Sequence, residues 1–339
     1  MADQTEMNDL LAAWHALSGK HDCEGWKTIP VSTKAPCLLL AGKKFPGNEE
    51  ALLVGFRKLT KNSMNIMPQG QGFEVSLLSS DPTQGDRSWI ALSRRPKASF
   101  DLFAKMTEDL LRFFDNNSSQ DEHMLLSLFM SRIRAWQDFM DRHREGVLSA
   151  DAELGLVGEL TILHEMLQAG MPPRKALESW QGPLNGLQDF MSESGSIEVK
   201  STLSSARFTA IISSLEQLDD TMHAPIILAA LRFINDNGMT LPEYINQIQS
   251  TVELNQDLLE IFNIRLLHAG YVHSNFEHYT RRFRHKSTSL FMVNDKFPRL
   301  IRNNVHPAIS KARYEINLEL IECSKLDLFN TLKIFGAIS

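Results

Sequence analysis

The sequence predicts an α/β protein with a mixed central sheet flanked by helices, together with an N-terminal α+β domain and a C-terminal extension. Short strand-like runs, separated by Gly, Pro, Asn and Asp, alternate with longer stretches of helical periodicity. One apolar run, Pro225 to Phe233 with Arg232 as its one charged residue, is typical of a central strand that is buried on both faces. At 339 residues, 43% hydrophobic and 22% charged, the chain is long enough for two domains or for one core with large additions.

Residues 1–120 are predicted to form the N-terminal α+β domain. A short amphipathic helix is expected over 7–17, and a turn-rich segment follows it. Apolar runs between turn residues predict strands at 37–40, 51–54, 73–77 and 89–92. Helical periodicity predicts helices at about 100–115 and 121–142, and the second of these lies in a helical connector, residues 121–148.

Residues 149–339 are predicted to hold the core sheet and the C-terminal extension. A helix is expected over 149–169, and strands are expected at 187–191, 196–201, 207–212 and 225–233. Helices at 241–248 and 252–267 follow the apolar strand. The tail alternates loops with strand-like segments at 289–293 and 314–318.

Charge and motif content exclude several classes of function. A net charge of −6 argues against a protein that coats nucleic acid, although a nuclease can confine its basic surface to one cleft. No P-loop, Gly-rich dinucleotide loop or GxSxG occurs, which disfavours an ATPase, a Rossmann dehydrogenase and a serine hydrolase. The three cysteines lie far apart without CxxC spacing, which disfavours a disulfide framework and a zinc site.

Membrane and export signals are not found. No apolar run reaches the roughly 18 residues that a membrane helix needs. The acidic N-terminus has no signal-peptide core. We therefore expect a cytoplasmic protein with no membrane partner.

The stretch from Leu187 to Thr202 carries the strongest chemical signal. It predicts two short strands joined by a tight turn, with Asp189 on the first and Glu198 and Lys200 on the second. Side chains two apart on a strand share a face, so Glu198 and Lys200 should lie side by side. A carboxylate on each arm, with a lysine beside one, suits divalent-metal hydrolysis of a phosphodiester. The alternative is an exposed strand face with an ordinary Glu–Lys pair.

The helix predicted over 149–169 carries a carboxylate among its core residues. At about 100° per residue, Glu159 falls inside the apolar arc of this helix. A carboxylate there is costly unless it is paired or coordinates a metal ion. Gly155 and Gly158 weaken the helix and indicate close approach of another segment, which we expect to be the hairpin. The alternative role of Glu159 is a helix-start carboxylate near the positive end of the helix dipole.

These residues together resemble the PD-(D/E)XK nuclease superfamily, also called restriction-endonuclease-like. The pattern reads Gly158-Glu159, then Trp180-Gln181-Gly182-Pro183, then Gln188-Asp189-Phe190, then Glu198-Val199-Lys200-Ser201. The chain is similar to a bacterial family of PD-(D/E)XK motif proteins, often found beside restriction–modification and phage-defence genes. The match covers roughly residues 150–235. Many relatives carry His before the Asp, where this chain has Gln188.

The resemblance implies a restriction-endonuclease-like core and a role for each site residue. Asp189 would hold the main Mg²⁺ ion, or Mn²⁺ in its place, and Glu198 with the Val199 backbone carbonyl would complete the protein ligands. Lys200 would orient the attacking water or offset the charge of the phosphorane. Glu159 would bind a second metal ion, or hold a metal-bound water or Lys200.

The densest basic run, Tyr279 to Lys286, is the candidate DNA-binding segment. Basic side chains interleaved with aromatic ones suit phosphate contacts and base stacking. The predicted contacts are Arg281, Arg282, Arg284 and Lys286, together with the Ser201 hydroxyl. The alternatives are a solvated loop or arginines that pair with acidic residues of the same chain, and for Ser201 an ordinary strand hydroxyl.

These expectations combine into a Mg²⁺-dependent DNA endonuclease of a bacterial restriction or phage-defence system. The expected partners are DNA, other subunits of such a system and a second copy of the chain. The alternative is a non-catalytic DNA-binding or scaffold subunit with a nuclease-like fold. Loss of a ligand would favour that alternative, yet all four site positions hold suitable residues.

Overall fold

The computed structural model describes residues 3–19, 24–31, 34–57, 67–79, 81–83, 85–142, 147–221, 224–322 and 325–337. The chain divides into two compact units. The first comprises Met1–Gly146 with Val272–Ser274, and the second comprises Val147–Tyr271 with Asn275–Ser339. Within the described ranges, every helix is too short or too polar to cross a membrane.

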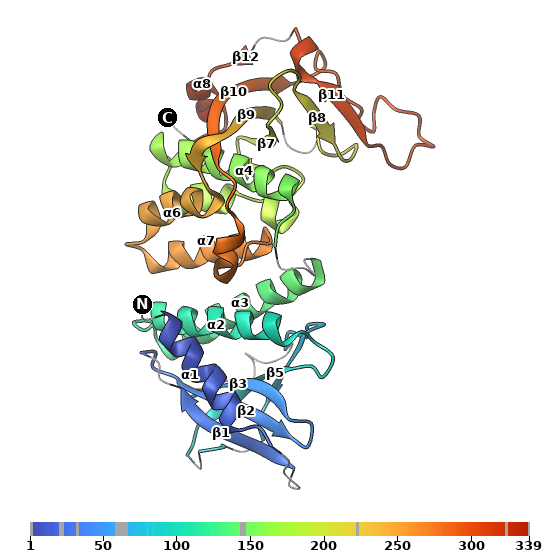
Figure 1. Ribbon diagram of the computed structural model, residues 1–339. Helices are drawn as coiled ribbons and strands as arrows, with labels where there is room; N and C mark the ends of the chain where they lie inside the picture. Colours follow the sequence, from blue (N-terminus) through green and yellow to red (C-terminus); the bar gives the residue numbers. More distant parts are fainter. Residues whose placement is uncertain are drawn as a thin grey trace. The chain divides into compact units, whose positions relative to one another are not determined.

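The first unit is built on an antiparallel five-stranded sheet in the order β1-β2-β3-β5-β4 (Figure 1). The strands are β1 (Gly25–Val31), β2 (Leu38–Phe45), β3 (Glu49–Phe56), β4 (Phe73–Leu77) and β5 (Ser88–Arg94). The helices are α1 (Asp3–Ala16), α2 (Phe100–Asn116) and α3 (Glu122–Arg142). Helix α1 packs on β2 and α2, where the buried Trp14 donates from Nε1 to the Ala51 carbonyl at 2.9 Å.

Strand β1 differs from the prediction, which places a turn-rich segment there. Most of its side chains are exposed or half-buried, and Pro30 interrupts the run, so it lacks the apolar pattern of an inner strand. It forms the edge of the sheet and pairs with β2 along its whole length. The exposed edge position explains why its composition resembles that of a loop.

The second unit holds a five-stranded mixed sheet, a two-stranded sheet and the helices that cover them (Figure 1). Its helices are α4 (Ala150–Gln168), α5 (Pro173–Ser179), α6 (Leu241–Val252), α7 (Gln256–His268) and α8 (Leu328–Ile334). Its strands are β6 (Phe190–Ser192), β7 (Gly195–Thr202), β8 (Thr209–Ile212), β9 (Ile226–Met239), β10 (Phe283–Val293), β11 (Tyr314–Asn317) and β12 (Lys325–Leu326). Its short 3₁₀ helices are η2 (Gly182–Leu184) and η4 (Leu318–Leu320), whereas η3 (His273–His278) has its first two residues in the first unit.

The mixed sheet, in the order β12-β10-β9-β7-β6, packs between two hydrophobic cores. Strand β7 runs parallel to β9, whereas the other three pairs of neighbouring strands in this sheet are antiparallel. Ile197 and Ile227 belong to the core that α4 and α6 close, and Leu228 and Ala230 belong to the core that β8 and β11 close. The apolar run at the start of β9 is therefore buried on both faces, as predicted.

The hairpin and the short helices differ from the prediction. Strand β6 begins at Phe190 instead of 187, because the Asp189 carbonyl accepts backbone hydrogen bonds from Gln181 and Gly182 at 2.7 and 2.9 Å. Helices α5 and α8 were not predicted, since seven residues are too few to show a clear period. Cys37 is a buried free thiol, and Cys23 and Cys323 lie outside the described residues.

Candidate active site

The β6–β7 hairpin fixes Asp189 beside the strand that carries Glu198. Phe190 pairs with Ile197 across the hairpin, so Asp189, one position earlier, stands opposite Glu198. The Val199 backbone N–H donates to Asp189 Oδ2 at 2.7 Å. This hydrogen bond orients the carboxylate and leaves Oδ1 for other contacts.

Glu198 and Lys200 form a buried ion pair on β7. The Lys200 Nζ atom lies 2.8 Å from Glu198 Oε1, and Gln217 donates from Nε2 to the same oxygen at 2.5 Å. The Glu198 side chain is 3% exposed and that of Lys200 is 18% exposed. Val199, between them, packs into the core that α4 closes, so the pair lies on the other face of the strand. The alternative of an exposed Glu–Lys pair is therefore wrong.

Glu159 of α4 reaches the same site and is oriented by Trp180. The indole Nε1 of Trp180 donates to Glu159 Oε2 at 2.6 Å, and the ring packs on Phe262 with centroids 6.0 Å apart. A Cβ atom at Gly182 would lie 2.8 Å from Glu159 Oε2 and 2.9 Å from Asp189 Oδ1. Both carboxylate oxygens thus face the 3₁₀ turn η2, where only glycine leaves room for them.

The two glycines of α4 behave differently. A Cβ atom at Gly158 would collide with Ser201 Oγ and would lie 3.3 Å from Val199 Cγ1, so the predicted close approach of the hairpin is confirmed there. Nothing lies within 4 Å of a Cβ atom at Gly155, so the prediction is wrong for that residue.

Ser201 does not lie where the predicted DNA contact would need it. Its Oγ atom is buried against α4 and has no hydrogen-bond partner among the described residues. By the alternation of the strand it points to the face opposite Lys200. The alternative of an ordinary strand hydroxyl describes Ser201 better.

Burial raises the pKa values of all three carboxyl groups. Desolvation raises the pKa of Asp189 to about 6 and that of Glu198 to about 8, and it holds the pKa of Glu159 well above its usual range. The charge of Asp189 raises the pKa of Glu159 and Glu198 further, whereas the Lys200 ammonium lowers all three pKa values. One lysine thus faces three carboxyl groups, and the site carries excess negative charge when they ionise.

The chemistry of this donor set fits a hard divalent cation. In the part of the chain that is described, no three His, Cys, Asp or Glu side chains are already arranged to hold a metal ion. One oxygen of each carboxylate is engaged by Trp180, by the Val199 N–H or by Lys200. A bound cation would relieve the repulsion between the carboxylates, provided that their side chains turn toward it.

The predicted DNA-binding arginines are paired with carboxylates of their own unit. The ion pairs are Arg281–Glu153 at 2.7 Å, Arg282–Glu243 at 3.2 Å and Arg284–Asp236 at 2.6 Å. Intramolecular pairing, the alternative for this run, therefore describes the three arginines. Lys286, the fourth predicted contact, is exposed.

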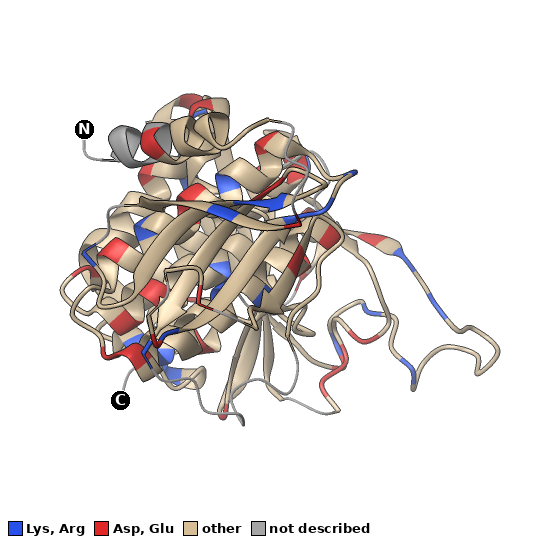
Figure 2. Ribbon diagram, turned by 90° about the horizontal axis from the view of Figure 1, so that it is seen from below, with Lys and Arg blue, Asp and Glu red and all other residues tan. Residues whose placement is uncertain are grey.

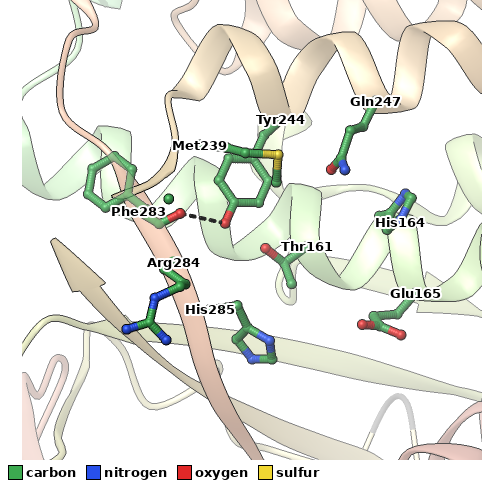
Figure 3. Close-up of a pocket in the computed structure, with 10 residues that line it drawn as sticks. Thr161, His164, Glu165, Met239, Tyr244, Gln247, Phe283, Arg284 and His285 are labelled. Atoms are coloured by element: carbon green, nitrogen blue, oxygen red, sulfur yellow. Dashed lines mark hydrogen bonds between the residues drawn. The ribbon is translucent and has the colours of Figure 1, made fainter. Parts of the chain in front are cut away.

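Arg284 and His285 also line a cavity of about 270 Å³ between α4, α6 and β10 (Figure 3). Glu165 of α4 and Tyr244 of α6 contribute to its walls, and the Tyr244 hydroxyl donates to the Phe283 carbonyl at 3.0 Å. None of the four predicted catalytic residues lines this cavity. It is therefore separate from the candidate active site.

Sequence reasoning assigned no role to Trp180 or Gln217, although each holds a carboxylate of the site. Trp180 belongs to the Trp-x-Gly turn of the recognised pattern, so a signal for it was present. Gln217 lies in a loop 19 positions after Glu198, where no periodicity places it. Gln188 donates from Nε2 to the Gln217 carbonyl at 3.2 Å and so supports that loop.

A family model covers most of the chain. The model described as "Putative PD-(D/E)XK family member, (DUF4420)" matches residues 10–319. No curated protein and no solved structure matches the chain. The match includes the hairpin, α4 and most of the first unit.

Proposed function

The chain belongs to this family of PD-(D/E)XK proteins, and from that membership we propose that it is a divalent-metal-dependent nuclease that hydrolyses phosphodiester bonds of DNA. The observation that carries the proposal is the buried cluster of three carboxyl groups around Lys200. Such a cluster destabilises a fold unless a cation compensates it, so its presence favours a functional role.

A restriction-endonuclease-like core in the second unit is part of this proposal. Helix α4 carries Glu159 and precedes a hairpin that carries Asp189 and then Glu198 and Lys200. Strand β9 extends the sheet in parallel with β7. This order and placement of the four residues support the assignment.

Each residue of the cluster takes a defined part. Asp189 and Glu198, with the Val199 carbonyl, would hold Mg²⁺ or Mn²⁺, and Glu159 would add a ligand or orient a water. When bound, the cation supplies an activated water and stabilises charge on the phosphate. Lys200 holds an ammonium group 2.8 Å from Glu198 Oε1, where it can orient the attacking water or offset charge as the leaving oxygen departs from phosphorus.

Cleavage of supercoiled plasmid and of end-labelled linear DNA tests this function. Wild-type protein should cut in Mg²⁺ or Mn²⁺ and not in EDTA. Lys200→Ala and Asp189→Asn should each lower the rate by at least about a hundredfold, the scale of losing a catalytic charge. Glu165→Gln is the matched control, because Glu165 lies on the same helix as Glu159 but lines the separate cavity (Figure 3). Equal cleavage by wild type and Asp189→Asn would refute the assignment.

A second candidate is a non-catalytic DNA-binding or scaffold subunit. It is favoured by one observation, that no three carboxylates of the described chain are arranged around a metal position. A wild type that binds DNA yet leaves it intact with every divalent cation would support this candidate. A role in restriction or phage defence, with partner subunits or a second copy, is supported by the family resemblance, and residence in the cytoplasm stays a prediction from the sequence.

A further inference from the structure

The second unit has another cavity, of about 530 Å³, on the face of the sheet that carries Lys200. Ala230 of β9 pairs with Lys200 on one side and with Ser289 of β10 on the other, so the three residues form one row across the sheet. Ala230 and Ser289 both line the cavity. Because directly paired residues point to the same face, Ala230 and Ser289 of the cavity lining lie on the same face of the sheet as Lys200.

The next row extends the same floor. Arg232 pairs with Thr202 on β7 and with Ser287 on β10, and both Arg232 and Ser287 line the cavity. The Arg232 guanidinium stacks over the Phe208 ring at 5.6 Å and is paired with Glu319 at 2.5 Å. It is therefore held in place, with its charge partly neutralised.

Lys286 supplies the remaining positive charge. The register of β10 against β9 shifts between His285 and Ser287, so Lys286 is the extra residue of a β-bulge. It is exposed and lines the cavity, and its ammonium group makes no hydrogen bond or ion pair with the described residues. Arg284, two positions earlier, is paired with Asp236 at 2.6 Å and is not among the residues that line this cavity.

The chemistry of this cavity matches a phosphodiester backbone. Its polar lining offers a free ammonium group, a positioned guanidinium and serine hydroxyls, with Glu319 as the acidic member. In Figure 2, the acidic and basic residues of the described chain are interspersed along the ribbon.

We propose that this cavity binds the backbone phosphates of the nucleic-acid strand that lies across Lys200, with Lys286 as the main charged contact. Ser287 and Ser289 donate hydrogen bonds to the phosphate oxygens. The inference rests on the proposed nuclease function, and it names the surface that carries the strand next to the cleavage site.

Binding of a fluorescent DNA duplex, followed by anisotropy in EDTA over a salt series, tests the inference without cleavage. Lys286→Ala should weaken binding several-fold and lower the slope of log affinity against log salt by about one unit, as expected for one lost phosphate contact. Arg284→Gln, two positions away with the same change of charge, should leave the slope unchanged. Ser289→Leu should weaken binding without a change of charge, because it fills the cavity beside Lys200.

The outcomes separate this inference from the proposed function. Equal slopes for wild type, Lys286→Ala and Arg284→Gln overturn the proposal that this cavity binds phosphates, while plasmid cleavage still reports on the catalytic cluster. Equal losses in Lys286→Ala and Arg284→Gln also overturn it, because they show a general charge effect. A wild-type protein without affinity for DNA also overturns the proposal that this cavity binds a nucleic-acid strand. Melting temperatures show whether the variants are folded. Because Lys286 is exposed, Lys286→Ala should leave the melting temperature unchanged.

Discussion

The indole N–H of Trp180 donates to Glu159 Oε2 at 2.6 Å, and this bond ties a turn next to the hairpin to the carboxylate of a distant helix. Burial raises the pKa of Glu159, and this is the larger effect. The hydrogen bond favours the ionised form of Glu159 and so lowers its pKa in part. In the proposed function Trp180 is a positioning residue, because it would act on the reacting groups through Glu159.

Trp180→Phe should reduce DNA cleavage and shift its pH profile to higher pH. Phenylalanine keeps an aromatic ring against Phe262 but removes the donor, so the pKa of Glu159 rises further. The lost hydrogen bond to a buried group should also cost about 1–3 kcal/mol of stability. Rate measurements across pH on wild type and Trp180→Phe check the shift.

The double variant with Glu159→Gln separates positioning from packing. Glutamine does not titrate, so Trp180→Phe should produce no pH shift in that background. A purely structural role of Trp180 predicts the same loss of activity at every pH. An unshifted profile in the single variant would therefore contradict the positioning role.

Stability of the metal-free protein should fall as pH rises from about 4.5 to about 8, the window set by Glu198. Its pKa is raised from 4.5 to about 8, so between these values the folded protein binds the proton more tightly than the unfolded chain. This contribution is complete below the unfolded pKa and is lost as pH rises through the folded pKa. Melting temperatures in EDTA across this window measure the slope.

Glu198→Gln is the control for this dependence, since it removes the titrating group at the same place. Its melting temperature should fall less steeply with pH than that of wild type. In the wild-type protein, Mg²⁺ should restore part of the stability lost at pH 8, because the ionised carboxylates can bind it there. Parallel curves for wild type and variant in EDTA would show that Glu198 does not titrate as its burial implies.

Gly182→Ala tests whether the two carboxylates need the space over η2. The added Cβ atom would lie 2.8 Å from Glu159 Oε2 and 2.9 Å from Asp189 Oδ1, so one or both must move. We expect a loss of cleavage that exceeds the loss of stability, because the collision is with side-chain ends and not with backbone. Cleavage rates and melting curves of the same samples give both quantities.

Gly155→Ala is the matched control for that substitution. Nothing lies within 4 Å of a Cβ atom at this helical position, so cleavage should be unchanged. The helix should become more stable by about 1 kcal/mol, the difference in propensity between glycine and alanine. Equal activity of Gly182→Ala and Gly155→Ala would show that the carboxylates do not depend on the space at Gly182.

Local periodicity predicted the parts of this site that depend on neighbours in sequence. The alternation along β7 placed Glu198 and Lys200 on one face, and the apolar arc of α4 turned Glu159 inward. The pairs formed by the basic run could not be predicted in this way. Arg281 bonds to Glu153, 128 positions away, and Arg284 bonds to Asp236, 48 positions away.

The same limit explains the other differences. Gln217 reaches Glu198 from an irregular loop, and no repeating pattern reports where a loop side chain ends. The bulge at Lys286 depends on the register between β9 and β10, which neither strand encodes alone. The sequence pattern therefore predicted which face of a single helix or strand a side chain occupies. It could not predict contacts between segments that are distant in sequence, which depend on the whole fold.

Asp189→Asn separates a functional carboxylate from a structural one. In wild type the Asp189 charge raises the pKa values of both Glu159 and Glu198, so a neutral amide removes repulsion from the cluster. The amide oxygen can still accept the Val199 N–H, which Asp189 Oδ2 now accepts at 2.7 Å. We expect the metal-free variant to be as stable as wild type or more stable near pH 8, yet inactive.

Mg²⁺ should raise the melting temperature of wild type and not that of the variant, since a bound cation stabilises only a protein that holds it. Thermal melts of both proteins with EDTA and with Mg²⁺ decide the question. A large loss of stability in EDTA would make Asp189 a structural residue, because the Val199 bond and not metal binding would then explain its place in the hairpin.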